Sequence, residues 1–135
     1  MVRYLLDTDT ASYIIRGNRP EIDRRLASVP TTDVCISSIT RAELLYGVRR
    51  KPGAEHLARV VARFLATVKS LPWDDDAADH FAIIAAELDA GGRRIGTFDT
   101  MIAAHALATA AVVVTNNVEH FSRVPGLAVE NWVDS

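Results

Sequence analysis

The sequence predicts an α/β protein built on a parallel sheet of four or five strands, with helices covering both faces. Short apolar runs alternate with longer segments whose apolar residues recur every three or four positions, as strands and helices require. No linker, low-complexity tract or internal repeat interrupts this series. The length of 135 residues is typical of one domain, so we expect a single domain over residues 1–135.

The first part of the chain predicts two strands and three helices. Residues 3–6 form a short apolar run that ends at Asp7, as expected of a buried strand. A helix can follow from about Asp9 to Gly17, because glycine readily ends a helix. Pro20 suits the first position of a second helix. The next expected elements are a strand at 33–37 and a helix at 39–50.

The second part predicts three more helices. Residues 57–68 show the clearest helical periodicity, and a short extended piece follows at 71–73. Residues 74–76 can cap a helix that ends at 91–92. The remaining expected elements are an alanine-rich helix and two strands, at 98–109, 111–115 and 127–131.

Composition and charge limit the partners and the cellular compartment to be expected. The net charge of −2 and the pI of about 6.0 count against nucleic-acid binding by bulk charge. Apolar runs are far shorter than the roughly 20 residues of a membrane helix, so no membrane partner is expected. The single cysteine, Cys35, excludes an internal disulfide and predicts a cytoplasmic protein. Its apolar neighbours predict a buried side chain and not a nucleophile.

Acidic and amide side chains stand where the predicted strands end. Asp7 follows the first strand, Glu43 lies near the start of the helix after the second, and Asp99 begins the alanine-rich helix. Asn116 and Asn117 follow the strand that ends at residue 115. In a parallel sheet these positions share the carboxyl edge, where α/β proteins bind ligands. Close carboxylates repel unless a cation neutralises them, and oxygen ligands favour Mg²⁺ or Mn²⁺.

Each acid also has a purely structural interpretation. Asp7 and Asp99 can cap the helices that begin beside them. Thr40 and Glu43 have the spacing of a capping box, in which Glu43 would bond a backbone amide. The pattern therefore predicts a metal site without defining its substrate.

Four ordered blocks resemble the VapC-type toxins, which belong to the PIN-domain ribonucleases. They are Leu5-Leu6-Asp7-Thr8-Asp9, residues 36–47, residues 95–106, and the closing region 114–132. The resemblance spans nearly the whole chain and implies that Asp7, Glu43 and Asp99 bind Mg²⁺ or Mn²⁺ and are catalytic. It implies a toxic endoribonuclease that cleaves a tRNA or rRNA loop with a metal-activated water. It further implies a cognate small antitoxin that contacts promoter DNA, and a homodimer.

The resemblance also suggests supporting residues. Asp7 and Asp99 are expected as direct metal ligands, whereas Glu43 binds the metal or orients the water. Hydrogen bonds around the site are expected from Thr8, Ser38 and Asn116. The basic residues expected to approach RNA are Arg16, Arg41, Arg93 and Arg94.

Two positions depart from the family pattern. Asn117 stands where many PIN domains carry a fourth acid, and Glu119 lies close enough in sequence to replace it. Asp9 stands where close relatives often have asparagine, so it adds negative charge beside Asp7.

Two other functions remain open at this point. A phosphatase of the haloacid dehalogenase type would use Asp7 as nucleophile and Asp9 as acid and base, although Ala11 stands where that family has threonine or valine. A catalytically inert PIN-like binding module is the second alternative, and Asn117 is the feature that favours it.

Overall fold

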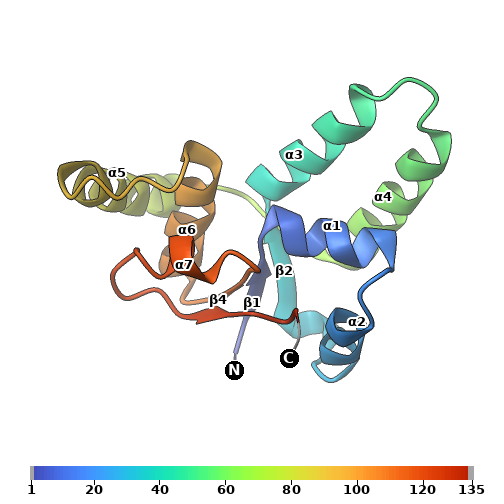
Figure 1. Cartoon of the computed structure of the whole chain (residues 1–135), viewed down its shortest axis with the longest axis horizontal. Helices are drawn as coiled ribbons and strands as arrows, with labels where there is room; N and C mark the ends of the chain where they lie inside the picture. The colour runs from blue at the N-terminus through green and yellow to red at the C-terminus, as the bar shows by residue number, and fades with distance from the viewer. Residues whose placement is uncertain (1, 134–135) are drawn as a thin grey trace.

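Five parallel strands form one sheet in the order β3-β2-β1-β4-β5. The structure, a computed structural model, describes residues 2–133 (Figure 1). The strands are β1 (Tyr4–Leu6), β2 (Val34–Ser37), β3 (Lys69–Leu71), β4 (Val112–Val114) and β5 (Val129–Glu130). Because β2 and β4 lie on opposite sides of β1, the strand order reverses direction at β1, where α/β folds place their binding sites.

The helices agree with the sequence prediction to within a few residues, apart from two short ones that were not predicted. The unpredicted elements are a 3₁₀ turn at Thr31–Asp33 and α7 (Val118–Phe121). The others are α1 (Thr8–Arg16), α2 (Pro20–Ala27), α3 (Ser38–Arg49), α4 (Glu55–Thr67), α5 (Asp75–Ala90) and α6 (Thr97–Thr109).

Alternating strand residues divide the core between the two faces of the sheet. Leu5 and Val113 pack with α5, α6 and α7, whereas Leu6 and Val114 pack with α1, α2, α3 and α4. The expected coverage of both faces is therefore confirmed, and Figure 1 shows the two groups of helices on either side of the strands. Cys35 lies in the first core, and burial raises the pKa of its thiol to about 11, so it is not a nucleophile.

Local sequence explains where the elements stop. Gly17 ends α1 in the left-handed conformation at a φ of 68°, as the sequence predicts. The third strand begins two residues earlier than the predicted extended piece at 71–73. It ends at Leu71 because Trp73 leaves the sheet, and its backbone N–H donates to the Ser38 hydroxyl at 3.0 Å. Among the described residues, no helix is long and apolar enough to span a membrane.

Candidate active site

Asp7 lies at the carboxyl end of β1, beside the reversal in strand order. Its backbone N–H donates to the Val114 carbonyl at 3.0 Å, so the main chain is fixed between the two strands. Its carboxylate caps α1 by accepting from the Thr10 N–H at 2.8 Å, and the Thr115 hydroxyl donates to it as well. Burial nevertheless raises the pKa of Asp7 above its ordinary value. Asp7 is thus a helix cap and a buried, rigidly held carboxylate at once.

Glu43 does not cap its helix, so the capping-box interpretation is wrong. The helix α3 begins at Ser38, and the Ser37 side chain caps it by accepting from a backbone amide. Glu43 lies in the second turn, beyond the reach of the free amides, and its Oε1 atom accepts from the Thr8 hydroxyl at 2.7 Å. Thr8 is also 3.1 Å from the Thr40 hydroxyl. These contacts hold Glu43 against the start of α1.

Asp99 occupies the first turn of α6, whose N-cap is Gly96 and has no side-chain capping bond. The pKa of Asp99 is raised from 3.8 to about 6, first by burial and then by the negative charges of Asp7, Asp9 and Glu43. Within residues 2–133 no cation forms an ion pair with any of these four acids. The acids therefore interact repulsively across one edge of the sheet.

The donor set suits a hard divalent cation. Asp7, Glu43 and Asp99 supply carboxylate oxygens only, which is the chemistry of Mg²⁺ and Mn²⁺ sites. In the described part of the chain, no three acidic, histidine or cysteine side chains already form a closed metal-binding group. The residues are thus electrostatically coupled at one edge, and an ion would have to draw their side chains inward.

The PIN domain family matches residues 4–127. The chain belongs to the PIN-domain family. The match covers strands β1 to β4 and the three acids Asp7, Glu43 and Asp99, and it agrees with the resemblance seen in the sequence. The phosphatase alternative, with Asp7 as nucleophile and Asp9 as acid and base, is excluded by this assignment.

Curated and solved relatives refine the assignment of this PIN domain. It is 41% identical over 132 residues to the tRNA(fMet)-specific endonuclease VapC of Salmonella typhimurium, covering 98% of this chain and 99% of the relative. It is 39% identical to ribonuclease VapC2 of Haemophilus influenzae, covering 98% and 100%. The crystal structure of DNA-bound VapBC from Salmonella typhimurium matches with a TM-score of 0.91 at 39% identity, covering 98% and 99%. The protein is a VapC-type ribonuclease toxin.

The position of the missing fourth acid contains a hydrogen-bonded pair. Asn117 precedes α7, and its Nδ2 atom lies 2.7 Å from Nδ1 of His120. The Asn117 backbone N–H donates to the Thr115 hydroxyl at 2.9 Å, and that hydroxyl also bonds Asp7. Asn117 is therefore connected to Asp7 through one side chain. Neighbouring Asn116 is exposed and accepts instead from Asn131 at 3.5 Å.

Glu119 does not take the place of the fourth acid in this structure. Its side chain is 84% exposed and pairs with Arg123 at 3.4 Å in the next turn. It is also absent from the charges that raise the pKa of Asp99, whereas exposed Asp9 is among them. Asp9 is thus closer to the acidic site, and the role of Glu119 stays a prediction.

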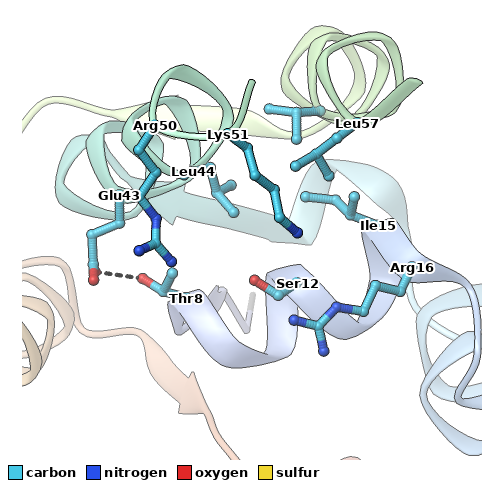
Figure 2. A pocket seen from close by; sticks show the side chains of 11 residues that line it. Thr8, Ser12, Ile15, Arg16, Glu43, Leu44, Arg50, Lys51 and Leu57 are labelled. Atoms are coloured by element: carbon cyan, nitrogen blue, oxygen red, sulfur yellow. Dashed lines mark hydrogen bonds between the residues drawn. The ribbon is translucent and has the colours of Figure 1, made fainter. Parts of the chain in front are cut away.

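The basic residues named from the sequence separate into two groups. Arg16 lines a pocket that Thr8 and Glu43 also line (Figure 2). Arg94 lines a different cavity, between α5 and the start of α6, and pairs with Asp89 at 2.7 Å. Arg41 on α3 and Arg93 after α5 belong to neither of these two pockets, and all four arginines are exposed.

Several residues that support the site were not identified from the sequence. Thr115 donates to Asp7, and the only signal in the sequence was its position at the end of a buried strand. His105 is buried with Nδ1 at 2.8 Å from the Ser37 hydroxyl, which connects α6 to the start of α3. Ser38, expected near the metal, instead accepts from the backbone of Trp73. These bonds fix the two helices that carry Glu43 and Asp99.

Proposed function

We propose that this VapC-type protein is a Mg²⁺- or Mn²⁺-dependent endoribonuclease in which Asp7 and Asp99 are metal ligands and Glu43 completes the site. The observation that carries the proposal is the raised pKa of Asp99, which reflects burial beside Asp7, Asp9 and Glu43 with no compensating cation in residues 2–133. A divalent ion would turn this repulsion into attraction to one centre.

The side chains have distinct roles in this scheme. A bound divalent ion would supply a Lewis acid that lowers the pKa of water and stabilises charge on the attacked phosphate. Asp7 offers a fixed ligand because Thr10 and Thr115 hold its carboxylate. Glu43 uses Oε1 to accept from Thr8, and no residue in 2–133 donates to its other oxygen. That oxygen is free to accept a proton from the attacking water or to bind the ion.

We propose a transfer RNA as the substrate. Two curated relatives, from Salmonella typhimurium and Shigella flexneri, are named tRNA(fMet)-specific endonucleases at 41% and 38% identity. Initiator tRNA is therefore the first RNA to test, and an rRNA loop is the alternative. Mapping of RNA 5′ ends after brief induction identifies the cleaved molecule, and a unique new end in initiator tRNA is the expected result.

We further propose that a small antitoxin binds and inhibits the protein. In the complex the antitoxin supplies the contacts to promoter DNA. We also propose that the toxin is a homodimer and that the pair is located in the cytoplasm. The support is the matching DNA-bound VapBC structure from Salmonella typhimurium. Co-expression with a candidate antitoxin, such as a small open reading frame found beside the gene, tests the pair. Growth arrest without that frame and growth with it are expected, and arrest in both cases would contradict the proposal.

Metal dependence is tested by calorimetry with Mn²⁺ and by RNA cleavage with Mg²⁺ or EDTA. Asp7→Asn is expected to lose ion binding and cleavage but to fold, since asparagine can still accept from the Thr10 amide. Asp23→Asn, an exposed aspartate on α2, is the matched control and should keep both. Cleavage of RNA that is equally fast in Mg²⁺ and in EDTA, or wild-type protein that binds no Mn²⁺, would refute the proposed metal dependence.

A further inference from the structure

A pocket lined by basic side chains adjoins the acidic site formed by Asp7, Glu43 and Asp99. It is a cavity of about 250 Å³ between α1, α3 and α4, and Thr8 and Glu43 form part of its wall. Figure 2 shows Arg16 and Ser12 reaching in from α1, with Arg50 and Lys51 reaching in from the end of α3. Its volume lies slightly below the range of small-ligand pockets, which begins at about 300 Å³, so it suits a small group such as a phosphate.

The charge of this pocket is not neutralised by the protein. Arg16, Arg50 and Lys51 form no ion pair with any residue from 2 to 133, and Glu43 is the single acid among the lining residues. Other unpaired arginines occur in residues 2–133, but these three basic residues are distinguished by lining one cavity. Three cations against one carboxylate around one cavity favour an anionic ligand.

Helix stabilisation does not fully explain these cations. Arg16 ends α1 and Arg50 follows α3, positions where the helix dipole favours positive charge. Yet no hydrogen bond joins any of the three side chains to a helix carbonyl within residues 2–133. Figure 2 shows Lys51 extending toward Ser12 and Arg50 lying beside Thr8 and Glu43, and Arg50 also lies 5.8 Å from the centre of the Tyr46 ring. Backbone bonds from Arg50 to Tyr46 at 3.0 Å and from Lys51 to Val48 at 3.2 Å fix the rim from which they extend.

The floor of the pocket is apolar. Leu44, Leu57 and Val61 line the same cavity, and the last of these is 3% exposed. Arg16, Arg50 and Lys51 are themselves exposed, so they surround the opening above this apolar floor. The Ser12 hydroxyl adds a neutral donor on the α1 side.

We propose that this pocket binds a phosphate of the RNA backbone next to the one that is cleaved, with Arg16, Arg50 and Lys51 as its ligands. The proposal rests on the ribonuclease function above, because Glu43 and Thr8 lie in the wall shared with the acidic site. Arg50 and Lys51 are positioning residues: they hold the strand so that the neighbouring phosphodiester meets Asp7, Asp99 and Glu43. They carry no proton in the reaction.

The test measures binding of a fluorescein-labelled RNA hairpin by anisotropy in EDTA, where cleavage is suppressed, from about 50 to 300 mM KCl. A triple variant, Arg16→Gln with Arg50→Gln and Lys51→Gln, is compared with a control triple that removes the same charge outside the pocket: Arg49→Gln, Arg59→Gln and Arg63→Gln. The pocket triple should bind more weakly, and the slope of log K against log salt should become shallower by about 0.7 for each phosphate that the variant no longer neutralises. The control should keep the wild-type slope.

Steady-state cleavage of total tRNA by the single variant Lys51→Gln provides a second readout that does not depend on the triple variant folding. The expected result is a KM raised about fivefold and a kcat within about twofold of wild type, as for weakened substrate binding. Equal slopes for the two triples, or an unchanged KM in Lys51→Gln, would overturn the proposal. Normal RNA binding with loss of antitoxin binding would also overturn it, since the pocket would then serve an acidic protein segment. If the wild-type protein cleaves no RNA, the proposed function itself fails, which is a separate outcome.

Discussion

Replacing Asp99 by asparagine should stabilise the metal-free protein, although Asp99 is a proposed metal ligand. The rise in the pKa of Asp99 from 3.8 to about 6 means that the folded state disfavours the ionised carboxyl. A rise of this size corresponds to about 3 kcal/mol at neutral pH. Because Asp99 is only partly buried, solvent and salt reduce this to about 1–2 kcal/mol. Asparagine has nearly the same shape, and Asp99 makes no side-chain hydrogen bond with residues 2–133 that the change would remove.

The sign of the pH dependence follows from the same shift. Since the pKa of Asp99 is higher in the folded than in the unfolded state, its favourable contribution is complete below about pH 3.8 and is lost as pH rises through about 6. The difference in unfolding free energy between Asp99→Asn and wild type should therefore be near zero at pH 4 and reach about 1–2 kcal/mol at pH 7. For a domain of this size that corresponds to a Tm higher by roughly 3–8 °C.

Urea and thermal denaturation in EDTA at several pH values measure this difference. Glu55→Gln is the control, because Glu55 is an exposed acid in the first turn of α4 and its removal should cost a fraction of a kcal/mol. An Asp99→Asn variant no more stable than wild type at pH 7 would refute the reasoning. Saturating Mg²⁺ should reverse the order: at 100 times Kd the wild type gains about 2.7 kcal/mol and the variant gains little.

Three further substitutions test the neighbours of the acids. Thr8→Val removes the 2.7 Å hydrogen bond to Glu43 and should reduce kcat about tenfold with little change in Tm, while Thr8→Ser should retain activity. Thr115→Val removes a donor to Asp7, so the pKa of Asp7 should rise further. As the pH is lowered, the variant should therefore lose Mn²⁺ affinity in calorimetric titrations at a higher pH than the wild type does. Asn117→Asp supplies the missing fourth acid and should tighten Mn²⁺ binding severalfold, and unchanged affinity would show that this position does not reach the ion.

Much of the fold could be predicted from the sequence because its signals are local. Gly17 and Pro20 mark helix ends by backbone geometry alone, and the periodicity of 57–68 matches a helix that packs one face inward. The short helix α7 had no such signal, since four residues are too few to show a period. The third strand covers Lys69–Leu71, two residues before the predicted piece at 71–73. Its end could not be predicted, because the backbone of Trp73 bonds to Ser38, which is far away in sequence.

The site shows the same division between local and long-range information. Parallel strands place Asp7 and the residues after β4 at one edge whatever the side chains do, so their proximity could be predicted. Glu43 could not be distinguished from a capping residue, because the start of α3 at Ser38 and the bond to Thr8 are tertiary features. The support of Asp7 by Thr115 also requires knowing that β1 and β4 are neighbours.

The net charge of −2 argued against nucleic-acid binding, yet the arrangement of charge removes this objection. At physiological ionic strength, interactions between exposed charges fade beyond about 8–10 Å, so an RNA phosphate responds to the groups around it and not to the total. Around the pocket of Figure 2 three basic residues, Arg16, Arg50 and Lys51, outnumber one acid, Glu43. A divalent ion among Asp7, Glu43 and Asp99 would also offset the negative charge that repels RNA at the acidic site. Metal binding and RNA binding should therefore be coupled, with Mg²⁺ tightening RNA binding to wild type and having little effect on Asp99→Asn.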